Sequence, residues 1–354
     1  MYRKYENGYC SCMPNSSHEL ICYRCGRIVK ERFPAGFLPE GEIDDMHCAG
    51  KGHVFRISDQ NQQYSLKIAE VEHDQFQTIG KRESGILKRL EGCPNTVKLI
   101  RATEITAGTD RRVYECLLEE YAVPLVLVKR MSGTDIIRLS MDICKAMLQC
   151  KSRGILHLDI KPGNILIDDN GNGLLCDFNT AENLEDLDKI HTTCGTLAYL
   201  APEAYQRKKY SEASDIYSLG ITMYAMLNGG RLPFTEYGFA DQETGVYKRL
   251  AGTPLPLPAG LAVSEAAIQL IALLKKMCAY DPIERIKSFE ECLEELNKTA
   301  EASFYEPIQM NWDNEITTVH LISDKSTVPP FHRPDINVTA QDVHIEAAKG
   351  PEDT

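Results

Sequence analysis

The sequence predicts an α+β protein with two lobes, because strand-like segments come first and helix-like segments follow within one continuous region. Residues 52–58 and 64–69 alternate apolar and polar side chains on the two sides of a polar loop, which is typical of a β-hairpin. Residues 211–228 and 264–277 are apolar over the length of a helix. With 354 residues, 43% of them hydrophobic, the chain can form two or three folded units.

The segments between these follow the same order. The run Glu-Ser-Gly-Ile-Leu-Lys-Arg-Leu at residues 83–90 has its apolar residues at helical spacing, which predicts a short helix. Residues 137–153 have the period of an amphipathic helix. Residues 165–177 contain two apolar strands joined through an Asn-Gly turn.

Composition excludes several classes of protein. The chain has 51 acidic and 39 basic residues, and its net charge of −12 argues against nucleic acid or an anionic membrane as the main partner. No apolar stretch approaches the roughly 20 residues that cross a bilayer as a helix, and the charged start does not resemble an export signal. The thirteen cysteines are mostly scattered, which favours reduced thiols. We therefore expect a soluble, cytoplasmic protein.

Three zones differ in composition. Residues 1–35 contain four cysteines and a small basic excess, residues 36–300 carry the strand and helix patterns, and residues 301–354 are acidic, with a net charge of −7. The last zone is rich in proline and polar residues, so we expect a partly disordered tail. Apolar residues around Trp312 could dock on the body or on a partner, whereas a solvated linker is expected after residue 325.

Three ordered motifs carry the clearest chemical signal. They are His-Leu-Asp-Ile-Lys-Pro-Gly-Asn at 157–164, Asp-Phe-Asn at 177–179 and Ala-Pro-Glu at 201–203. In these motifs the sequence resembles the eukaryotic-type protein kinases, whose signatures are H-R-D-x-x-x-x-N, D-F-G and A-P-E in that order. The resemblance covers about residues 36–300. It implies a bilobal fold, with an antiparallel sheet and one helix up to about residue 121 and a mainly helical lobe from about residue 122.

The resemblance also implies catalytic roles. Asp159 would orient the acceptor hydroxyl and take its proton, and Lys161 would offset charge on the transferring phosphate. Asn164 and Asp177 would supply oxygen ligands for Mg²⁺. Thr196 would bridge the catalytic Asp and Lys, a feature that favours serine or threonine as acceptor.

Other positions are assigned to ATP binding and to structure. Lys67 corresponds to the lysine that pairs with the α- and β-phosphates, and Glu83 to the helix glutamate that holds it. The resemblance implies further nucleotide contacts from Gly52, Val54, Glu120 and Leu166. It implies structural roles for His157, Phe178, Glu203, Asp215 and Arg285, with Asp215 bracing the catalytic loop and Arg285 pairing with Glu203. Whether Leu118 or Glu119 stands at the mouth of the adenine pocket is not fixed by the sequence.

The sequence departs from the family pattern at several places. If Gly52 and Val54 end the glycine-rich loop, His47 and Ala49 replace its first two glycines, and we expect a weaker grip on ATP. Asn179 replaces the glycine of Asp-Phe-Gly, and we expect it to adopt the positive φ that asparagine tolerates best among residues with a side chain.

Leu158 replaces the arginine that binds a phosphate on the activation segment in this family. We therefore expect activity that depends less on phosphorylation of that segment. Thr192 and Thr193 are either phosphorylation sites or ordinary loop residues.

These residues predict a protein serine/threonine kinase that uses ATP and Mg²⁺ and acts on a protein substrate. The departures leave open a pseudokinase that serves as a scaffold or nucleotide sensor. A small-molecule phosphotransferase shares the His-x-Asp-x-x-x-x-Asn loop but lacks the Gly-Thr and Ala-Pro-Glu segments, and it ranks lower.

The N-terminal zone has a pattern of its own. Cys10 and Cys12 form a C-x-C pair, and Cys22 and Cys25 form a C-x-x-C pair followed by glycine. Four thiolates suit tetrahedral Zn²⁺, and the pattern resembles a small zinc ribbon. His18 could replace one cysteine, and unliganded or redox-active thiols are the alternative.

Overall fold

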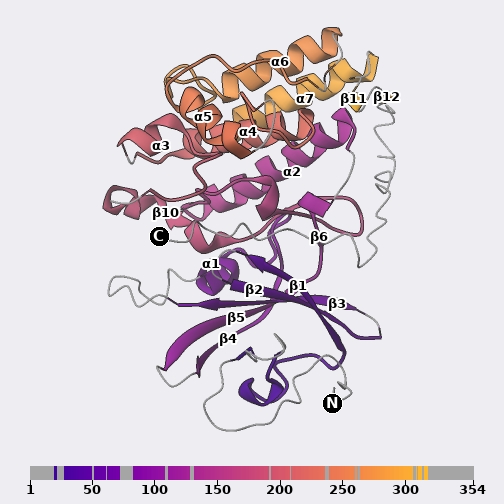
Figure 1. Cartoon of the computed structure of the whole chain (residues 1–354), viewed down its shortest axis with the longest axis vertical. Helices are drawn as coiled ribbons and strands as arrows, with labels where there is room; N and C mark the ends of the chain where they lie inside the picture. The colour runs from indigo at the N-terminus through magenta and orange to yellow at the C-terminus, as the bar shows by residue number, and fades with distance from the viewer. Residues whose placement is uncertain are drawn as a thin grey trace, which may run out of the picture.

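The computed structural model has a sheet lobe and a helical lobe joined by a linker (Figure 1). It describes residues 20–21, 28–49, 52–60, 62–71, 83–107, 111–127, 131–190, 193–207, 209–235, 239–259, 261, 264–305, 308, 310–312 and 315–317. The predicted α+β, bilobal architecture is confirmed.

The N-lobe is built on one antiparallel sheet of strand order β1-β2-β3-β5-β4. Its strands are β1 (Glu42–Ala49), β2 (Gly52–Ser58), β3 (Gln63–Glu70), β4 (Leu99–Ala107) and β5 (Arg112–Glu120). Strands β2 and β3 pair from Gly52↔Ala69 to Ser58↔Gln63, so the predicted hairpin is confirmed. Helix α1 (Glu83–Arg89) is the predicted short helix, and it contacts β4 and the loop that follows Asp177.

The two faces of this sheet bury different partners. One face carries Leu66, Ile68 and Leu118, which pack in a single cluster with Leu20 and Ile28 from the N-terminal segment. In Figure 1 the 3₁₀ turn of that segment, η1 (Lys30–Arg32), lies beyond the sheet from the helical lobe. The predicted zone of residues 1–35 is therefore not separate in its described part, because its apolar residues cover the outer face of the sheet. Arg101 also fastens the segment, through a hydrogen bond of 2.9 Å to the Phe37 carbonyl.

The C-lobe begins at the linker and contains six helices among the described residues. They are α2 (Gly133–Ser152), α3 (Pro202–Arg207), α4 (Glu212–Leu227), α5 (Phe239–Leu250), α6 (Glu265–Met277) and α7 (Phe289–Tyr305). Helices α4 and α6 confirm the helices predicted at 211–228 and 264–277. Helix α2 begins four residues before the predicted start, because Ser132 and Asp135 form a capping box.

Short elements carry the site between the lobes. They are β6 (Val123–Pro124), η3 (Leu125–Leu127), β7 (Ile155–Leu156), η4 (Pro162–Asn164), β8 (Ile165–Ile167), β9 (Gly173–Leu175), η5 (Phe178–Thr180), β10 (Glu182–Asn183) and η6 (Leu184–Lys189). Strands β8 and β9 pair as the predicted hairpin, and β6 pairs with β8 directly after the linker. The two motif loops thus follow β7 and β9 and meet at the edge of the C-lobe.

The expected boundary at residue 300 falls inside helix α7. Beyond it, Ile308 and Met310 are buried in the C-lobe core, and β11 (Met310–Trp312) pairs with β12 (Glu315–Thr317). A Cβ atom on Gly133 would overlap the side chain of Ile308, so this packing is tight. The helical lobe therefore extends past residue 300, because apolar side chains of the tail complete its core.

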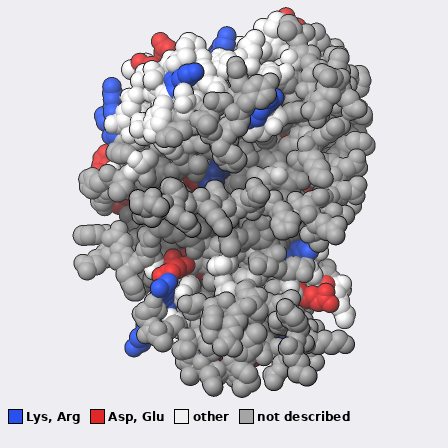
Figure 2. Space-filling view, in the orientation of Figure 1, with Lys and Arg blue, Asp and Glu red and all other residues white. Residues whose placement is uncertain are grey.

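Two surface properties follow from the described residues. None of their helices is long and apolar enough to cross a membrane. On the face in Figure 2, the coloured side chains of both signs are spread over both lobes.

Cys10, Cys12, Cys22 and Cys25 lie outside the described residues, as does Thr192.

Candidate active site

Three charged side chains meet under the sheet. The Lys67 Nζ atom on β3 donates to Glu83 Oε2 on α1 at 2.7 Å and to Asp177 Oδ1 at 2.6 Å. The other oxygen of Glu83 accepts from the backbone N–H of Phe178 at 3.0 Å. One carboxylate therefore ties helix α1 both to the lysine and to the Asp177 loop.

Charge–charge interactions keep Lys67 and Asp177 ionised. Burial acts to lower the pKa of Lys67, but the carboxylates of Glu83, Asp177 and Glu119 outweigh burial and raise it. Burial also acts to raise the pKa of Asp177, but Lys67 reverses the direction and lowers it. At neutral pH the lysine is thus a cation and Asp177 a carboxylate, the forms that bind phosphate and a metal ion respectively.

The catalytic-loop motif folds into a second network. The Nζ atom of Lys161 donates to Asp159 Oδ2 at 2.8 Å and to Thr196 Oγ1 at 2.7 Å. Asp159 Oδ1 accepts from the backbone N–H of Thr196 at 2.7 Å. The amide nitrogen of Asn164 donates to Asp159 Oδ2 at 3.0 Å and to the Asp159 carbonyl at 2.8 Å. The structure therefore brings together all four residues assigned to catalysis.

The donor set suits a hard cation. Because the Asn164 nitrogen is used on Asp159, its amide oxygen remains for a metal, and Asp177 contributes a carboxylate. Two protein oxygens with phosphates and water are a usual Mg²⁺ environment. Among the described residues there is no cluster of three His, Cys, Asp or Glu side chains able to hold a metal on its own.

Buried residues brace the catalytic loop from below. The two oxygens of Asp215 accept from the backbone N–H groups of His157 and Leu158, at 2.9 and 2.8 Å. Burial raises the pKa of Asp215 to about 7, although these two donors act to lower it. The His157 ring meets the fully buried Phe178 ring edge-on, with centroids 4.9 Å apart. Its Nε2 atom faces the Cys176 carbonyl at 3.0 Å.

The protonation of His157 follows from its partners. Burial lowers its pKa, which favours the neutral ring. Nε2 faces a carbonyl and therefore carries the proton, whereas Nδ1 accepts from the Asp159 N–H at 3.3 Å.

Glu203 and Arg285 form a buried bidentate ion pair. Arg285 Nη1 lies 2.8 Å from Glu203 Oε1, and Nη2 lies 3.1 Å from Oε2. The guanidinium also donates to the Ala213 carbonyl and stacks over the Tyr217 ring at 4.7 Å. The pair joins α3 to the loop before α7, as the resemblance implies.

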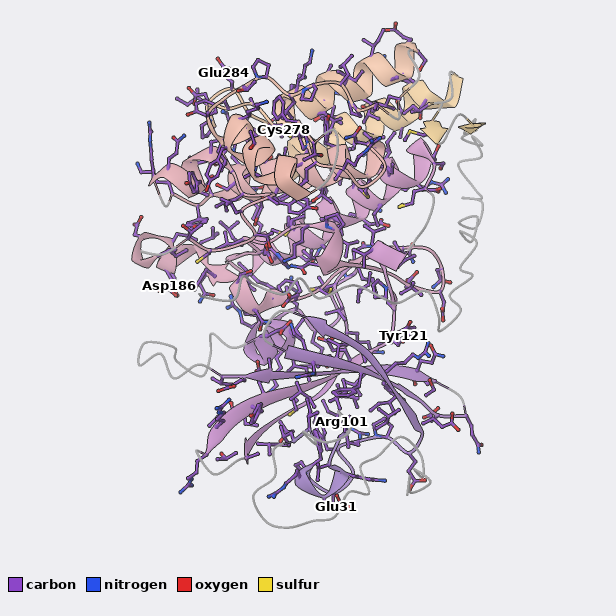
Figure 3. All side chains as sticks on the ribbon, in the orientation of Figure 1. Glu31, Arg101, Tyr121, Asp186, Cys278 and Glu284 are labelled. Carbon is purple, nitrogen blue, oxygen red and sulfur yellow. The ribbon has the colours of Figure 1, made fainter. Side chains whose placement is uncertain are left out.

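The residues expected to contact the nucleotide lie on β2, on β8 and at the end of β5. Gly52 is the first residue of β2 and pairs with Ala49 of β1, and Val54 pairs with Lys67 across β2 and β3. Leu166 on β8 pairs with Pro124 of the linker region. Glu120 is exposed and pairs with Lys98 at 3.3 Å, and the next residue, Tyr121, is labelled between the lobes in Figure 3.

The expectation for Asn179 is wrong. The positive φ of this loop belongs to Asp177, at 61°, whereas Asn179 lies in the 3₁₀ turn η5. The Asn179 amide instead donates to Asp177 Oδ1 at 2.8 Å. A side chain is useful there because it orients the carboxylate, and glycine could not do so.

Sequence reasoning missed two sets of polar contacts. The buried Arg249 on α5 donates to the carbonyls of residues 197, 198 and 200 and to Tyr217 Oη, which fixes the segment after Thr196. Arg89 at the end of α1 donates to Asn183 Oδ1 at 2.6 Å and to the Arg153 carbonyl. In the sequence, both arginines look like exposed residues near the end of a helix. Only comparison with related folds could have indicated that they bind distant segments.

Comparison with known proteins agrees with this geometry. A family model described as protein kinase domain matches residues 49–296. CBL-interacting protein kinase 1 of Oryza sativa subsp. japonica is 31% identical over 290 residues, which cover 77% of this chain and 57% of that protein. The hormonally up-regulated neu tumor-associated kinase of Homo sapiens is 31% identical over 217 residues, which cover 60% of this chain and 29% of that protein. The chain thus matches less than two thirds of the length of either relative.

Proposed function

The chain belongs to the protein kinase family, and we propose that it is an active protein serine/threonine kinase that transfers the γ-phosphate of ATP to a protein hydroxyl. The observation that carries this proposal is the simultaneous assembly of two networks, Lys67 with Glu83 and Asp177, and Lys161 with Asp159 and Thr196. Phosphoryl transfer needs positioning and charge neutralisation, and these networks provide both.

Each network has its own part in the proposed reaction. When bound, ATP with Mg²⁺ supplies the phosphoryl group and a cation that neutralises developing charge. Lys67, held by Glu83, positions the nucleotide phosphates, and Asn164 and Asp177 would hold the metal. Asp159 accepts the proton of the attacking hydroxyl, while Lys161 stands beside the transferred phosphate.

The acceptor is assigned from the segment after residue 193. Thr196 donates its backbone N–H to Asp159 and accepts from Lys161, which supports a serine or threonine acceptor by the family pattern. The buried Glu203–Arg285 pair and Arg249 support the same segment from behind. This platform favours a protein over a small-molecule substrate.

A phosphate on the activation segment would lack its usual cationic partner in the catalytic loop. The loop position that would bind such a phosphate is Leu158, which is buried. Helix α1 is instead held by the Phe178–Glu83 and Arg89–Asn183 hydrogen bonds. We infer that activity does not require phosphorylation of Thr192 or Thr193.

The experiment that separates a kinase from a pseudokinase is phosphoamino acid analysis. The full chain is incubated with labelled ATP, Mg²⁺ and a generic protein acceptor, with Lys67→Ala as control. We expect label on serine and threonine with the wild type, and a loss of label with Lys67→Ala. Absence of label under varied divalent metals, with nucleotide binding retained, would establish the pseudokinase alternative. Label on tyrosine alone would contradict the acceptor assignment.

We also propose that Cys10, Cys12, Cys22 and Cys25 bind Zn²⁺. The support is local: Ile21 and Ile28 form an antiparallel bridge, and the Val29 N–H donates to the Leu20 carbonyl at 2.9 Å. The residues that flank the C-x-x-C pair on its two sides are therefore held next to each other, which suits a metal-binding knuckle between them. Metal analysis of the wild type and Cys22→Ser tests this, and a metal-free wild type would end it.

The remaining proposals concern the cellular compartment of the protein and the class of its partner. Eight described cysteines are not in disulfide bonds, which fits a reducing compartment and supports a cytoplasmic protein. The net charge of −12 supports a protein partner over nucleic acid or an anionic membrane.

A further inference from the structure

A cavity of about 400 Å³ lies at the edge of the N-lobe, and none of the residues that line it belongs to the candidate active site. Its lining runs from Leu87 on α1, through the loop that joins α1 to β4, as far as Ala102 on the edge strand β4. We call it the α1–β4 cavity. Small-molecule sites in proteins have volumes of about 300–1,000 Å³, so the cavity is large enough to bind such a ligand.

The walls of the α1–β4 cavity are mainly apolar. Leu87, Leu90 and Val97 are buried in the core that α1 shares with the C-lobe. Leu99 and Ala102 on β4 are partly buried and pack against the same core. An apolar group that entered the cavity would leave water and contact these side chains, which favours its binding.

The rim of the α1–β4 cavity has an excess of positive charge. Three exposed basic residues line it, Lys88, Lys98 and Arg101, together with one exposed acidic residue, Glu91. Arg101 is already hydrogen-bonded to a backbone carbonyl, so the two lysines are the groups that can contact a charge on a ligand. Lys98 pairs with Glu120 at 3.3 Å, but its side chain is 67% exposed. On a chain of net charge −12, this local excess would attract an anion.

The α1–β4 cavity lies between two segments that lead to the candidate active site. Helix α1 forms one side of the cavity and carries Glu83 at its first position. The loop on the other side is fixed to β9, because the Val97 N–H donates to the carbonyl of Leu175 at 2.9 Å. Leu175 stands two residues before Asp177. A ligand held between α1 and this loop would therefore support the arrangement in which Glu83 and Asp177 both contact Lys67.

We propose that the α1–β4 cavity binds a small apolar molecule with a carboxylate group, and that this binding favours the arrangement of α1 in which Glu83 reaches Lys67. The apolar part occupies the cavity, and the carboxylate lies at Lys88 and Lys98. The second half of this inference rests on the proposed function, because it assumes that Lys67 binds the phosphates of a nucleotide. A ligand that binds one arrangement of a protein more tightly than another shifts the population toward it.

The ligand class is tested with 6-phenylhexanoate and with its amide, which has nearly the same shape but no charge. Equilibrium dissociation constants are measured without nucleotide. We expect the wild type to bind the carboxylate about threefold to fivefold more tightly than the amide, as an exposed ion pair allows. A variant with both Lys88→Gln and Lys98→Gln is expected to bind the two equally. Lys145→Gln changes an exposed lysine on α2 and is the matched control, which should keep the preference.

Cys93 reports where the molecule binds. Cys93 lines the cavity and is partly exposed, and Cys194, close to Thr196, is partly exposed as well. Alkylation of each cysteine by N-ethylmaleimide is followed by mass spectrometry of the peptides. We expect 6-phenylhexanoate to slow alkylation of Cys93 and to leave that of Cys194 unchanged. Equal rates at Cys93 with and without the carboxylate, or a preference for the carboxylate that survives in the double lysine variant, would overturn the site.

The effect on the active site is measured separately, as the dissociation constant for ATP with Mg²⁺ and no acceptor protein. We expect saturating 6-phenylhexanoate to tighten ATP binding by about fivefold. An unchanged constant would overturn the second half of the inference. Because none of these measurements includes phosphoryl transfer, a protein that binds both molecules as expected but does not phosphorylate would contradict only the kinase proposal.

Discussion

Gly195 lies against the carbonyl group of Leu158, so closely that a Cβ atom at residue 195 would overlap the Leu158 oxygen. Both residues have positive φ, 93° for Gly195 and 66° for Leu158. The contact joins the segment that carries Thr196 to the loop that carries Asp159. The glycine is therefore required twice, for its backbone conformation and for the absence of a side chain.

Gly195→Ala is expected to abolish most phosphoryl transfer, because relief of the overlap must move the Thr196 N–H away from Asp159. Gly154→Ala is the matched control, since Gly154 also has positive φ but has open space where the Cβ atom would stand. We expect the control to lose only about 1 kcal/mol of stability and to keep its activity. Thermal melting and phosphate incorporation measure the two effects, and equal behaviour of the two variants would contradict the account.

Arg285→Ala is expected to destabilise the fold by roughly 3–5 kcal/mol, because it leaves the Glu203 carboxylate buried without its cation. Lys298→Ala is the control, since Lys298 pairs with Glu294 and Glu295 on the exposed surface of α7. That change is expected to leave the free energy of unfolding nearly unchanged. Denaturant unfolding measures the free energy of unfolding of both variants. Similar losses in the two variants would contradict the claim that burial makes the Glu203–Arg285 pair important for stability.

Alanine at both Thr192 and Thr193 is expected to leave activity within about threefold of the wild type. The reason is that Leu158 stands where the family has a phosphate-binding arginine, while α1 is held by hydrogen bonds to Phe178 and Asn183. Asn183→Ala is expected to lower activity by about fivefold, because the loss of one hydrogen bond near 1 kcal/mol loosens α1. Steady-state rates of the two proteins decide the matter, and a large loss in the threonine variant would show that phosphorylation is needed.

Glu119→Gln is expected to stabilise the protein more at high pH than at low pH. Burial raises the pKa of Glu119 from its ordinary value near 4.5 to about 8, so the folded state binds more protons than the unfolded state between these values. Wild-type stability therefore falls as the pH rises through this window, and glutamine does not titrate. The difference in melting temperature should grow from pH 5 to pH 8 and then level off. Parallel curves for the two proteins would contradict the assignment of this pKa.

The residues proposed to be catalytic could be named from the sequence because each stands in a short motif. Asp159, Lys161 and Asn164 are fixed by one loop, and Lys67 and Glu83 by a strand and the helix that follows it. Glu203 and Arg285 are 82 residues apart, so their pairing came only from the resemblance to a known family.

Other features could not be read in advance for physical reasons. Strand β5 alternates between two buried faces, so its pattern of apolar residues does not reveal that Glu119 is turned inward. Arg89 and Arg249 acquire their partners only when distant segments pack together. Asn179 lies in a 3₁₀ turn and donates to the Asp177 carboxylate, a contact that the preference of asparagine for positive φ does not predict.

The central claim is that Asp159 accepts the proton of a protein hydroxyl in a site that also binds ATP and Mg²⁺. It is tested most directly by the rate of phosphate transfer to a generic acceptor at saturating ATP, for the wild type and Asp159→Asn. We predict a loss of at least about 100-fold in the variant, with the dissociation constant for ATP changed by less than about threefold. Equal rates for the two proteins would contradict the claim.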